Sequence, residues 1–186
     1  MTRLLIQKRV LVLGEDTRSF LSVIRSLGSA GMEVDIVTLL NTTPALRSKY
    51  VNKAYKLNYQ AFTQFEWSDK VAAIIQDGDY DLIIPCDERS LYPLLDIQAS
   101  KITRAIFAIP DRSILGPLFD KEETRKLAEE LGISVASGEH CEFNETSTEA
   151  LISKYSLPLA LKPTKSYESE QLNRRNTVLI ARSTSD

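Results

Sequence analysis

The stretch "RVLVLGEDTRSFLSVIRSLGSAGMEVDIVTL", residues 9–39, changes its hydrophobic period twice. Its first apolar run ends at Gly14 and is typical of a strand that is covered on both faces. From Phe20 onward the apolar residues recur at helical spacing, and Gly28 and Gly31 are expected to close that helix. A second apolar run, "EVDIVTL", follows. The stretch therefore predicts a βαβ unit whose right-handed crossover makes the two strands parallel neighbours.

The same alternation of strands and helices continues to about Pro110, which predicts a doubly wound α/β domain over residues 1–110. The further elements expected in this domain are a strand at 53–57, a helix at 63–76 with a capping box of Thr63 and Glu66, a strand at 80–86, a helix at 88–98 that Pro93 is expected to distort, and a strand at 105–109.

The pattern changes after Pro110. Residues 111–133 are expected to form a connecting region whose helix has Asp120 as its N-cap and ends at Gly132. A second capping box, Thr146 and Glu149, is expected to open another helix, and the strands "LPLALKP" and "TVLIARS" follow it. Two strands and one helix bury little apolar surface, so residues 134–186 are expected to be the incomplete beginning of a second, α+β domain.

Composition narrows the class of protein. The 186 residues carry a net charge of −2, so the chain has no overall basic field for nucleic acid. Its longest apolar runs have the length of strands, and the first nine residues lack an apolar core long enough for a signal peptide. We expect a cytoplasmic protein with neither nucleic acid nor a membrane as its partner. Cys86 and Cys141 are far apart in sequence and indicate neither a zinc site nor a disulfide framework.

Two loops are expected to meet where the winding of the sheet reverses, since the first and fourth strands are neighbours there. The loops are "GEDTRS", residues 14–19, and "PCDERS", residues 85–90. They offer the N–H groups of a helix start near residues 17–19 to an anion. Alternatively, their side chains cap helices and pair with one another. The candidate binding residues are Arg18 and Arg89 for carboxylate or phosphate, and Asp16, Asp87 and Glu88 for amines or hydroxyls.

Other chemistries have weaker support. Glu15 and Asp16 follow Gly14, so G-x-G-x-x-G is missing and the acids would repel a pyrophosphate; no P-loop motif occurs either. The single histidine, His140, precedes Cys141, but adjacent residues of an extended segment point to opposite sides, which favours a surface loop over a catalytic dyad. The carboxylates of Glu168 and Glu170 are candidate metal ligands, although polar loop residues are the simpler interpretation.

Four stretches in this order resemble the N-terminal portion of the ATP-grasp superfamily, especially carboligases akin to the carbamoyl-phosphate synthase large chain, biotin carboxylase and the pyrrolysine-pathway ligase. The resemblance implies a Rossmann-like, three-layer pre-ATP-grasp domain with a parallel sheet, followed by the start of the nucleotide-binding domain. The stretches are "VLVLGEDTRSFLSVIRSLGSAGMEVDIV", "LIIPCDERSLYPLL", "DKEETRKLAEELGISV" and "LPLALKP".

The resemblance also implies a reaction and a set of binding residues. Lys121 matches the family lysine that reaches the nucleotide phosphates, and Lys162 matches the strand-end lysine that contacts phosphate and borders the adenine pocket. The implied protein is an ATP-dependent carboxylate–amine ligase that acts through an acyl phosphate, with ATP and magnesium as cofactors, small carboxylates and amines as substrates, and a homodimer as a further expectation. Without the resemblance, both lysines are solvated surface residues.

Two departures from the family pattern matter. The family commonly has a glycine-rich loop after the Lys-Pro strand, whereas residues 164–176 contain no glycine. The family residues that hold magnesium lie beyond the last expected strand. We therefore expect this fragment to have no turnover by itself. A non-catalytic ligand-binding or regulatory module with a pre-ATP-grasp-like fold remains the alternative, and half of a two-domain glycosyltransferase fits the α/β pattern but not the two lysine motifs.

Overall fold

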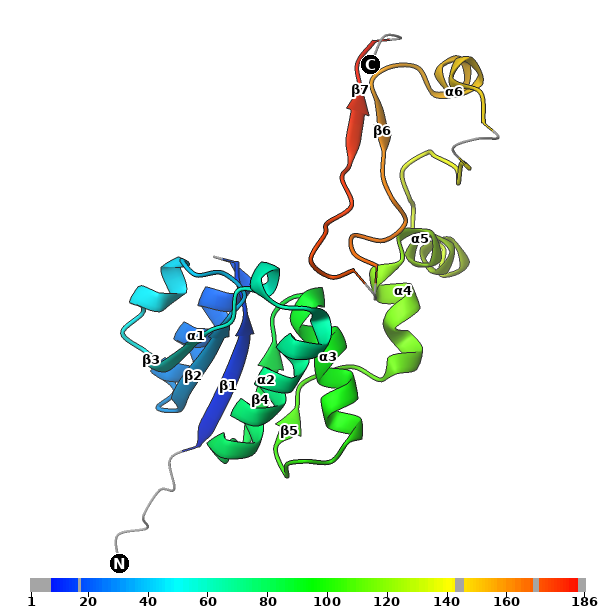
Figure 1. Cartoon of the computed structure of the whole chain (residues 1–186). Helices are drawn as coiled ribbons and strands as arrows, with labels where there is room; N and C mark the ends of the chain where they lie inside the picture. Colours follow the sequence, from blue (N-terminus) through cyan, green and yellow to red (C-terminus); the bar gives the residue numbers. More distant parts are fainter. Residues whose placement is uncertain (1–7, 17, 143–145, 169–170, 184–186) are drawn as a thin grey trace, which may run out of the picture. The chain divides into compact units, whose positions relative to one another are not determined.

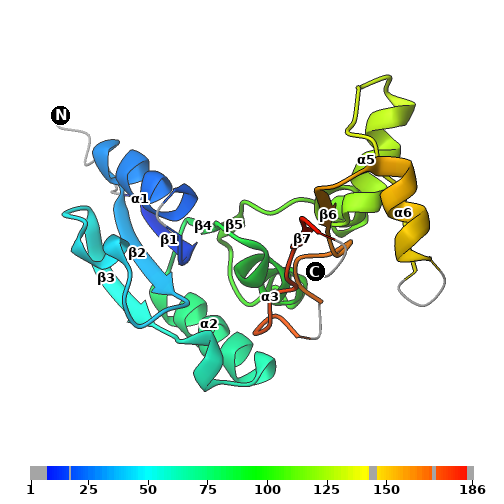
Figure 2. The same cartoon turned by 90° about the horizontal axis from the view of Figure 1, so that it is seen from above.

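The computed structural model describes residues 8–16, 18–142, 146–168 and 171–183, and it divides into two units. Unit 1 comprises Met1–Pro110 together with Ser169–Asn173. Unit 2 comprises Asp111–Glu168 and Arg174–Asp186. Figures 1 and 2 show the elements of both units from two directions.

Unit 1 is built on a five-stranded sheet with the order β3-β2-β1-β4-β5, in which every neighbouring pair is parallel. The first strand lies between the second and the fourth, as the sequence predicts for a doubly wound sheet. The expected α/β class is therefore confirmed. The strands are β1 (Arg9–Gly14), β2 (Glu33–Thr38), β3 (Val51–Lys56), β4 (Leu82–Pro85) and β5 (Ile106–Phe107).

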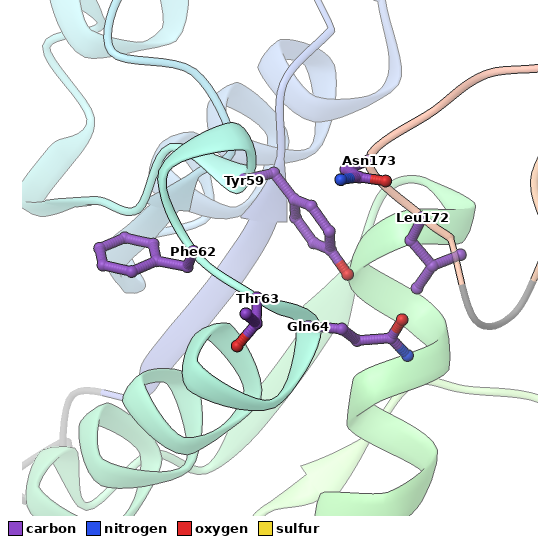
Figure 3. Close-up of a pocket in the computed structure, with 6 residues that line it drawn as sticks. All are labelled: Tyr59, Phe62, Thr63, Gln64, Leu172 and Asn173. Carbon is purple, nitrogen blue, oxygen red and sulfur yellow. The ribbon is translucent and has the colours of Figure 1, made fainter.

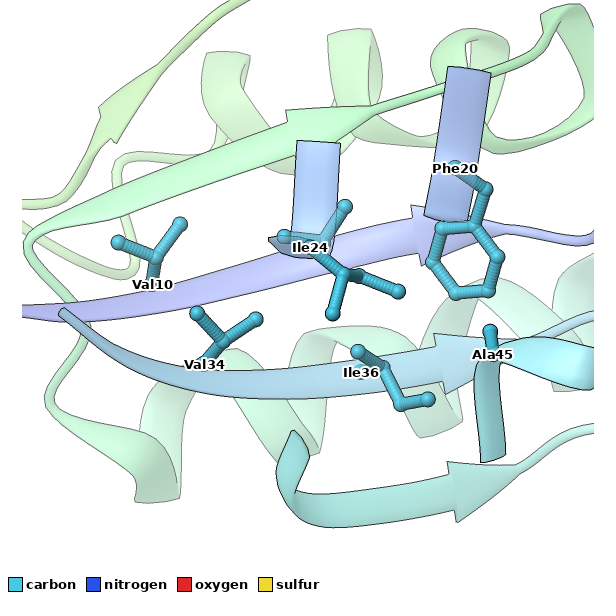
Figure 4. Close-up of a cluster of buried hydrophobic side chains, with 7 residues drawn as sticks. Val10, Phe20, Ile24, Val34, Ile36 and Ala45 are labelled. Carbon is cyan, nitrogen blue, oxygen red and sulfur yellow. The ribbon is translucent and has the colours of Figure 1, made fainter. Parts of the chain in front are cut away.

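Helices cover both faces of this sheet (Figure 2). One face packs against α1 (Ser19–Ser29) and the short 3-10 helix η1 (Pro44–Arg47). The other carries α2 (Gln64–Gly78) and α3 (Glu88–Ala99), with η2 (Tyr59–Ala61) before α2. Since side chains alternate across a strand, the two faces have separate cores. Figure 4 shows the α1-side cluster, which consists of Val10, Val12, Phe20, Ile24, Val34, Ile36 and Ala45.

The helix α1 differs from the expectation at Gly28. This residue lies inside the helix rather than at its end, which is capped by Ala30 and followed by Gly31 at φ 86°. A Cβ on Gly28 would lie only 2.4 Å from the Cβ of Tyr50. Glycine is therefore needed here for close approach, a requirement that helical periodicity does not encode.

Three other elements also differ from the prediction: α3 is not distorted, and the strands β5 and β3 have other bounds. The helix α3 runs without interruption through Pro93, whose ring is buried. Burial of the ring with its apolar neighbours offsets the hydrogen bond that proline cannot donate. The strand β5 has two residues rather than five, and β3 begins at Val51, two residues before the predicted start.

A buried carboxylate joins four elements near the amino end of the sheet. Asp35 of β2 is fully buried and accepts hydrogen bonds from Arg9 Nη2, Tyr80 Oη and Asn52 Nδ2, each at 2.8 Å. Arg9 belongs to β1, Asn52 to β3, and Tyr80 to the turn before β4. Glu33 adds a second ion pair to Arg9 Nε, at 3.0 Å. The network therefore fixes three strands to one another.

Unit 2 contains a helical segment followed by a two-stranded antiparallel sheet. Asp120 is the N-cap of α5, as predicted, and accepts from the backbone N–H groups of Glu122 and Glu123. The predicted capping box at Thr146 is wrong. The N-cap of α6 is Ser147, one residue further on, whose hydroxyl accepts from Ala150 N; two adjacent hydroxyl residues satisfy the same local rule. The elements are η3 (Arg112–Ile114), α4 (Leu115–Phe119), α5 (Lys121–Glu130), α6 (Thr148–Tyr155), β6 (Leu159–Leu161) and β7 (Leu179–Ala181).

Apolar side chains of unit 2 remain exposed in the part of the chain that the structure describes. The elements α5, α6, β6 and β7 contain no buried residue. Leu131 after α5 is 67% exposed, and Leu179 of β7 is 60% exposed. The expected α+β character of this part is confirmed, and its elements bury little surface against one another.

Candidate functional site

The loops that follow β1 and β4 are bonded to each other. The backbone N–H of Cys86 donates to the carbonyl of Leu13 at 2.8 Å, and the hydroxyl of Ser19 donates to the carbonyl of Cys86 at 3.1 Å. A Cβ on Gly14 would lie 3.0 Å from the Cβ of Cys86 and 3.1 Å from the ring of Phe20. The loops therefore approach closely at the carboxyl ends of neighbouring parallel strands, where ligands bind in open α/β sheets.

Asp16 occupies the start of α1. Its carboxylate accepts from the N–H groups of Arg18 at 3.0 Å and Phe20 at 2.9 Å, and from the Ser19 hydroxyl at 2.6 Å. Burial acts to raise the pKa of Asp16, but these hydrogen bonds outweigh it and lower the pKa. The N–H groups at the start of α1, which we expected to bind an anion, thus donate to Asp16 instead. Thr17 lies outside the described residues.

The two candidate arginines lie in different environments. The side chain of Arg18 is exposed at the start of α1. Arg89 is only 12% exposed, forms an ion pair with Glu15, and has its guanidinium carbon 5.9 Å from the centroid of the Tyr59 ring. Glu88, the first residue of α3, is half-buried. The structure therefore brings Arg89 together with residues of the neighbouring loop and leaves Arg18 at the surface.

Asp87 is the N-cap of α3. Its Oδ1 accepts from the N–H and the hydroxyl of Ser90 at 2.9 and 3.0 Å, whereas its buried Oδ2 has no hydrogen-bond partner among the described residues. Burial raises the pKa of Asp87 to about 6, and the negative charge of Asp16 adds to this, while the bonds from Ser90 act in the opposite direction. The carboxyl of Asp16 is therefore held ionised, whereas that of Asp87 titrates closer to neutral pH.

This raised pKa makes stability depend on pH. Because folded Asp87 binds its proton more tightly than in the unfolded chain, its contribution is complete below about pH 4 and is lost as the pH rises through about 6. An asparagine side chain at this position would cap α3 equally well without a charge. We expect Asp87→Asn to raise the free energy of unfolding by about 2–3 kcal/mol at pH 7, since the pKa rises from 3.8 to about 6 and one pKa unit corresponds to about 1.4 kcal/mol.

Urea unfolding of Asp87→Asn at pH 4 and pH 7 checks this prediction, with no difference from the wild-type protein expected at pH 4. Asp111→Asn is the matched control, because Asp111 is an exposed cap whose pKa is lowered by its hydrogen bonds from Ser113. We expect Asp111→Asn to lower the free energy of unfolding at pH 7, because the ionised carboxylate of Asp111 is stabilised in the folded protein. An equal gain for Asp87→Asn at both pH values would contradict the raised pKa.

A pocket of about 60 Å³ lies beside these loops in unit 1. Figure 3 shows the Tyr59 hydroxyl pointing toward the side where Leu172 and the Gln64 amide lie. Tyr59 is 2% exposed, and burial, together with the Asp87 charge, raises the pKa of its hydroxyl. The pocket is lined by Tyr59, Phe62, Thr63, Gln64, Leu172 and Asn173.

Several buried oxygens near this pocket have no hydrogen-bond partner among the residues that the structure describes. They are Glu15 Oε2, Tyr59 Oη, Gln64 Oε1 and Asp87 Oδ2. Leaving a buried acceptor unpaired costs free energy, about 1–3 kcal/mol each. Such oxygens accept hydrogen bonds from N–H or O–H donors, which a water molecule supplies as well as an ammonium or amide group does. These four oxygens therefore suit a group that carries hydrogen-bond donors.

The remaining nucleophile and metal candidates do not gather into a site. Burial raises the pKa of the Cys86 thiol to about 12, with the charges of Asp87 and Asp16 adding to it, so the thiolate is disfavoured. His140 is exposed and its Nε2 lies 2.9 Å from Glu142 Oε1. Within the described ranges no three His, Cys, Asp or Glu side chains are placed to hold a metal ion. These residues by themselves do not fit a magnesium site, and Glu170 lies outside them.

Lys121 and Lys162, for which the resemblance implies nucleotide binding, lie in different surroundings within unit 2. The backbone N–H of Lys121 donates to the carbonyl of Thr164 at 2.8 Å, and its ammonium lies 3.3 Å from the same oxygen and 3.4 Å from the Ser166 hydroxyl. Lys162 follows β6 directly and its side chain is exposed. The start of α5 is therefore bonded to the segment after β6.

Sequence reasoning missed Glu15 as a partner of Arg89 and missed Tyr59 and Gln64 entirely. The place of Glu15 in the loop is visible in the sequence, but the pattern there indicates only an acid that repels a pyrophosphate. Tyr59 and Gln64 follow the edge strand β3 and carry no motif. Leu172 was detectable as the one large apolar residue within the polar run "SEQLNRRN".

Solved structures with the same architecture support the fold assignment. N5-carboxyaminoimidazole ribonucleotide synthetase from Thermotoga maritima matches 97% of this chain with a TM-score of 0.56 at 13% identity. The fold is that of the N-terminal part of ATP-grasp enzymes. L-amino acid ligase from Bacillus licheniformis matches 96% of the chain with a TM-score of 0.59, also at 13% identity. Identities this low show the ATP-grasp likeness at the level of the fold.

A third match is the biotin carboxylase domain dimer of the Hydrogenobacter thermophilus 2-oxoglutarate carboxylase, solved with MgADP and bicarbonate, with a TM-score of 0.58 at 13% identity over 94% of this chain. The chain spans 42%, 40% and 37% of the lengths of these three ATP-grasp proteins, which is less than half of each. The sequence matches no family model and no curated protein. No helix in the described part of the chain is long and apolar enough to cross a membrane.

Proposed function

We propose that this chain is the N-terminal part of an ATP-dependent ligase that activates a carboxylate as an acyl phosphate and passes it to an amine. The observation that carries the proposal is the fold, which nearly the whole chain shares with proteins described as synthetases, carboxylases and ligases. Two such structures hold ADP, one of them with magnesium. Lys121 and Lys162 are the proposed nucleotide-binding residues, and a homodimer is the proposed assembly.

The geometry of unit 1 supports a substrate site at the two loops. The guanidinium groups of Arg18 and Arg89 suit a carboxylate. The carboxylates of Asp87 and Glu88, together with the unpaired Glu15 oxygen, suit an amine. A small molecule that carries both groups is the proposed substrate class.

Calorimetry with MgATP tests the nucleotide part of the proposal on residues 1–186. We expect Lys162→Gln to weaken binding by about tenfold, the typical loss for one charge-assisted hydrogen bond. Lys126→Gln is the matched control. Lys126 is an exposed lysine of α5, paired only weakly with Glu122 at 3.5 Å, and its loss is expected to change binding less than about twofold. No heat of binding, or equal losses in both variants, would contradict the nucleotide role.

The fluorescence of Trp67 tests the substrate part. Trp67 is the sole tryptophan, and its ring lies 4.9 Å from that of Tyr59 beside the proposed site. Titration with the free amino acids, each carrying a carboxylate and an amine, is expected to change the emission for a subset of them. Arg18→Gln is expected to weaken that response by about tenfold. If no amino acid changes the emission, the result contradicts the substrate site and supports the alternative that the loop residues only cap helices and pair with one another.

The alternative is a ligand-binding or regulatory module without catalysis. The observation that favours it is the segment after β6, where residues 164–176 contain no glycine. A substrate response together with absent MgATP binding is the result expected for this alternative.

A further inference from the structure

The connection between β6 and β7 contributes one buried side chain to unit 1. Residues 111–168 and 174–186 belong to unit 2, whereas Ser169–Asn173 belong to unit 1. Within this segment Leu172 is 1% exposed, while Gln171 and Asn173 on either side of it are exposed. Unit 1 therefore buries a single leucine whose two chain neighbours face solvent.

Leu172 lines the same pocket as Tyr59. The other lining residues are Asn173 and residues of the segment 59–64, which runs from η2 into the start of α2. Figure 3 shows Leu172 on the side toward which the Tyr59 hydroxyl points. Leu172 therefore closes the pocket at the hydroxyl end of Tyr59.

Burial of apolar surface is what holds this segment on unit 1. In the part of the chain that the structure describes, no hydrogen bond joins residues 171–173 to the rest of unit 1. Burying the leucine side chain favours docking, whereas ordering the exposed residues around it costs conformational entropy. A contact that depends on one side chain can open locally, without unfolding of the sheet.

Docking of Leu172 also leaves polar groups without partners. The Tyr59 hydroxyl and the Gln64 carbonyl oxygen are buried and have no hydrogen-bond partner among the described residues. An unpaired buried hydroxyl costs a free energy of the same order as the gain from burying one leucine. When Leu172 leaves the pocket, water reaches both groups and forms the missing bonds. The docked and released states are therefore close in free energy.

We propose that Leu172 is a releasable latch, which covers the Tyr59 hydroxyl when it is docked and opens the unit 1 pocket to solvent when it is released. The pocket borders the start of α3, since the Arg89 guanidinium carbon lies 5.9 Å from the centroid of the Tyr59 ring. Release thus exposes two polar groups, those of Tyr59 and Gln64, beside the candidate loops. The latch does not rest on the proposed ligase activity, because it follows from packing within unit 1.

Thiol labelling of Leu172→Cys in residues 1–186 measures the release. Leu179→Cys is the exposed reference, because Leu179 is 60% exposed, and Val12→Cys is the core reference, because Val12 of β1 is fully buried. We expect Leu172→Cys to react at least about tenfold more slowly than Leu179→Cys and at least about tenfold faster than Val12→Cys. Mass spectrometry assigns each rate to its position, since Cys86 and Cys141 also carry thiols.

Urea below the unfolding transition separates release from unfolding. We expect it to leave the labelling rate of Leu172→Cys nearly unchanged, because release exposes little surface. The rate of Val12→Cys is expected to rise steeply with urea, because the thiol in β1 becomes accessible only when the whole unit unfolds.

The Tyr59 hydroxyl gives a second test. In the Leu172→Cys background, Tyr59→Phe is expected to slow labelling by about tenfold, because the docked state then contains no unpaired hydroxyl. Tyr50→Phe is the matched control, since Tyr50 is half-buried on the α1 side of the sheet. It is expected to change the rate by less than about twofold. Far-ultraviolet circular dichroism establishes that each variant is folded.

Three results would overturn the latch. Labelling of Leu172→Cys that is as slow as that of Val12→Cys, with the same urea dependence, would place Leu172 in the cooperative core of unit 1. Labelling as fast as that of Leu179→Cys would mean that Leu172 is not docked. An unchanged or faster rate on adding Tyr59→Phe would mean that docking does not cover the hydroxyl. An intermediate rate that is insensitive to urea and slowed by Tyr59→Phe supports the latch.

Discussion

Asp35→Ala is expected to lower the free energy of unfolding by about 3–5 kcal/mol, the usual cost of breaking a buried ion pair from one side. The substitution removes the acceptor shared by Arg9, Tyr80 and Asn52. The hydroxyl of Tyr80, which is 4% exposed, then loses its bond to this carboxylate, and Arg9 Nη2 loses its ion pair, so that Glu33 alone remains as the partner of Arg9.

Urea unfolding followed by circular dichroism measures this loss. Glu33→Ala is the control, because Glu33 lies on the same strand and pairs with the same arginine, but its side chain is 31% exposed. Its removal is expected to cost less than about 1 kcal/mol. Comparable losses for the two variants would mean that burial of the Asp35 network contributes little to stability.

Trp67→Ala has the second large expected effect, a loss of about 3–5 kcal/mol. Trp67 is fully buried in α2, and its indole Nε1 donates to the carbonyl of Leu57 at 3.1 Å. The ring also packs against Tyr59 at a centroid distance of 4.9 Å. Its loss creates a cavity and releases the segment that carries Tyr59 into the unit 1 pocket, so we expect substrate affinity to fall together with stability.

Phe65→Ala on the same helix is the matched control for Trp67→Ala, since Phe65 is 84% exposed. We expect it to change the unfolding free energy by less than about 0.5 kcal/mol. Trp67→Phe creates a smaller cavity than Trp67→Ala and also removes the bond to Leu57, so we expect an intermediate loss. A Trp67→Ala variant as stable as Phe65→Ala would show that the α2-side core does not depend on this side chain.

Local patterns predicted most of the elements of unit 1. The hydrophobic period identified β1, α1 and β2, and the Thr63 box, with both of its hydrogen bonds, opens α2 where it was expected. A cap depends on residues three positions apart, so its signal survives in the sequence. Where two hydroxyl residues were adjacent, at Thr146 and Ser147, the same rule identified the helix but not its first residue.

The candidate site was predictable only in part. Parallel strand order implies that the loops after β1 and β4 meet, and they do. The partners of the charged residues were not predictable. Asp16 takes the N–H groups at the start of α1, and Arg89 pairs with Glu15 rather than facing outward, because burial favours pairing of charges that the chain itself supplies.

By itself, the sequence determined the order of strands and helices and the parallel topology of the first unit. Only the tertiary structure decided which groups became partners. Asp35 meets Tyr80 across 45 positions, Gly28 is needed because Tyr50 packs against it, and Leu172 shares a pocket with Tyr59. The physical reason is range: periodicity and caps act over a few residues, whereas burial, close approach and charge pairing depend on segments that only folding brings together.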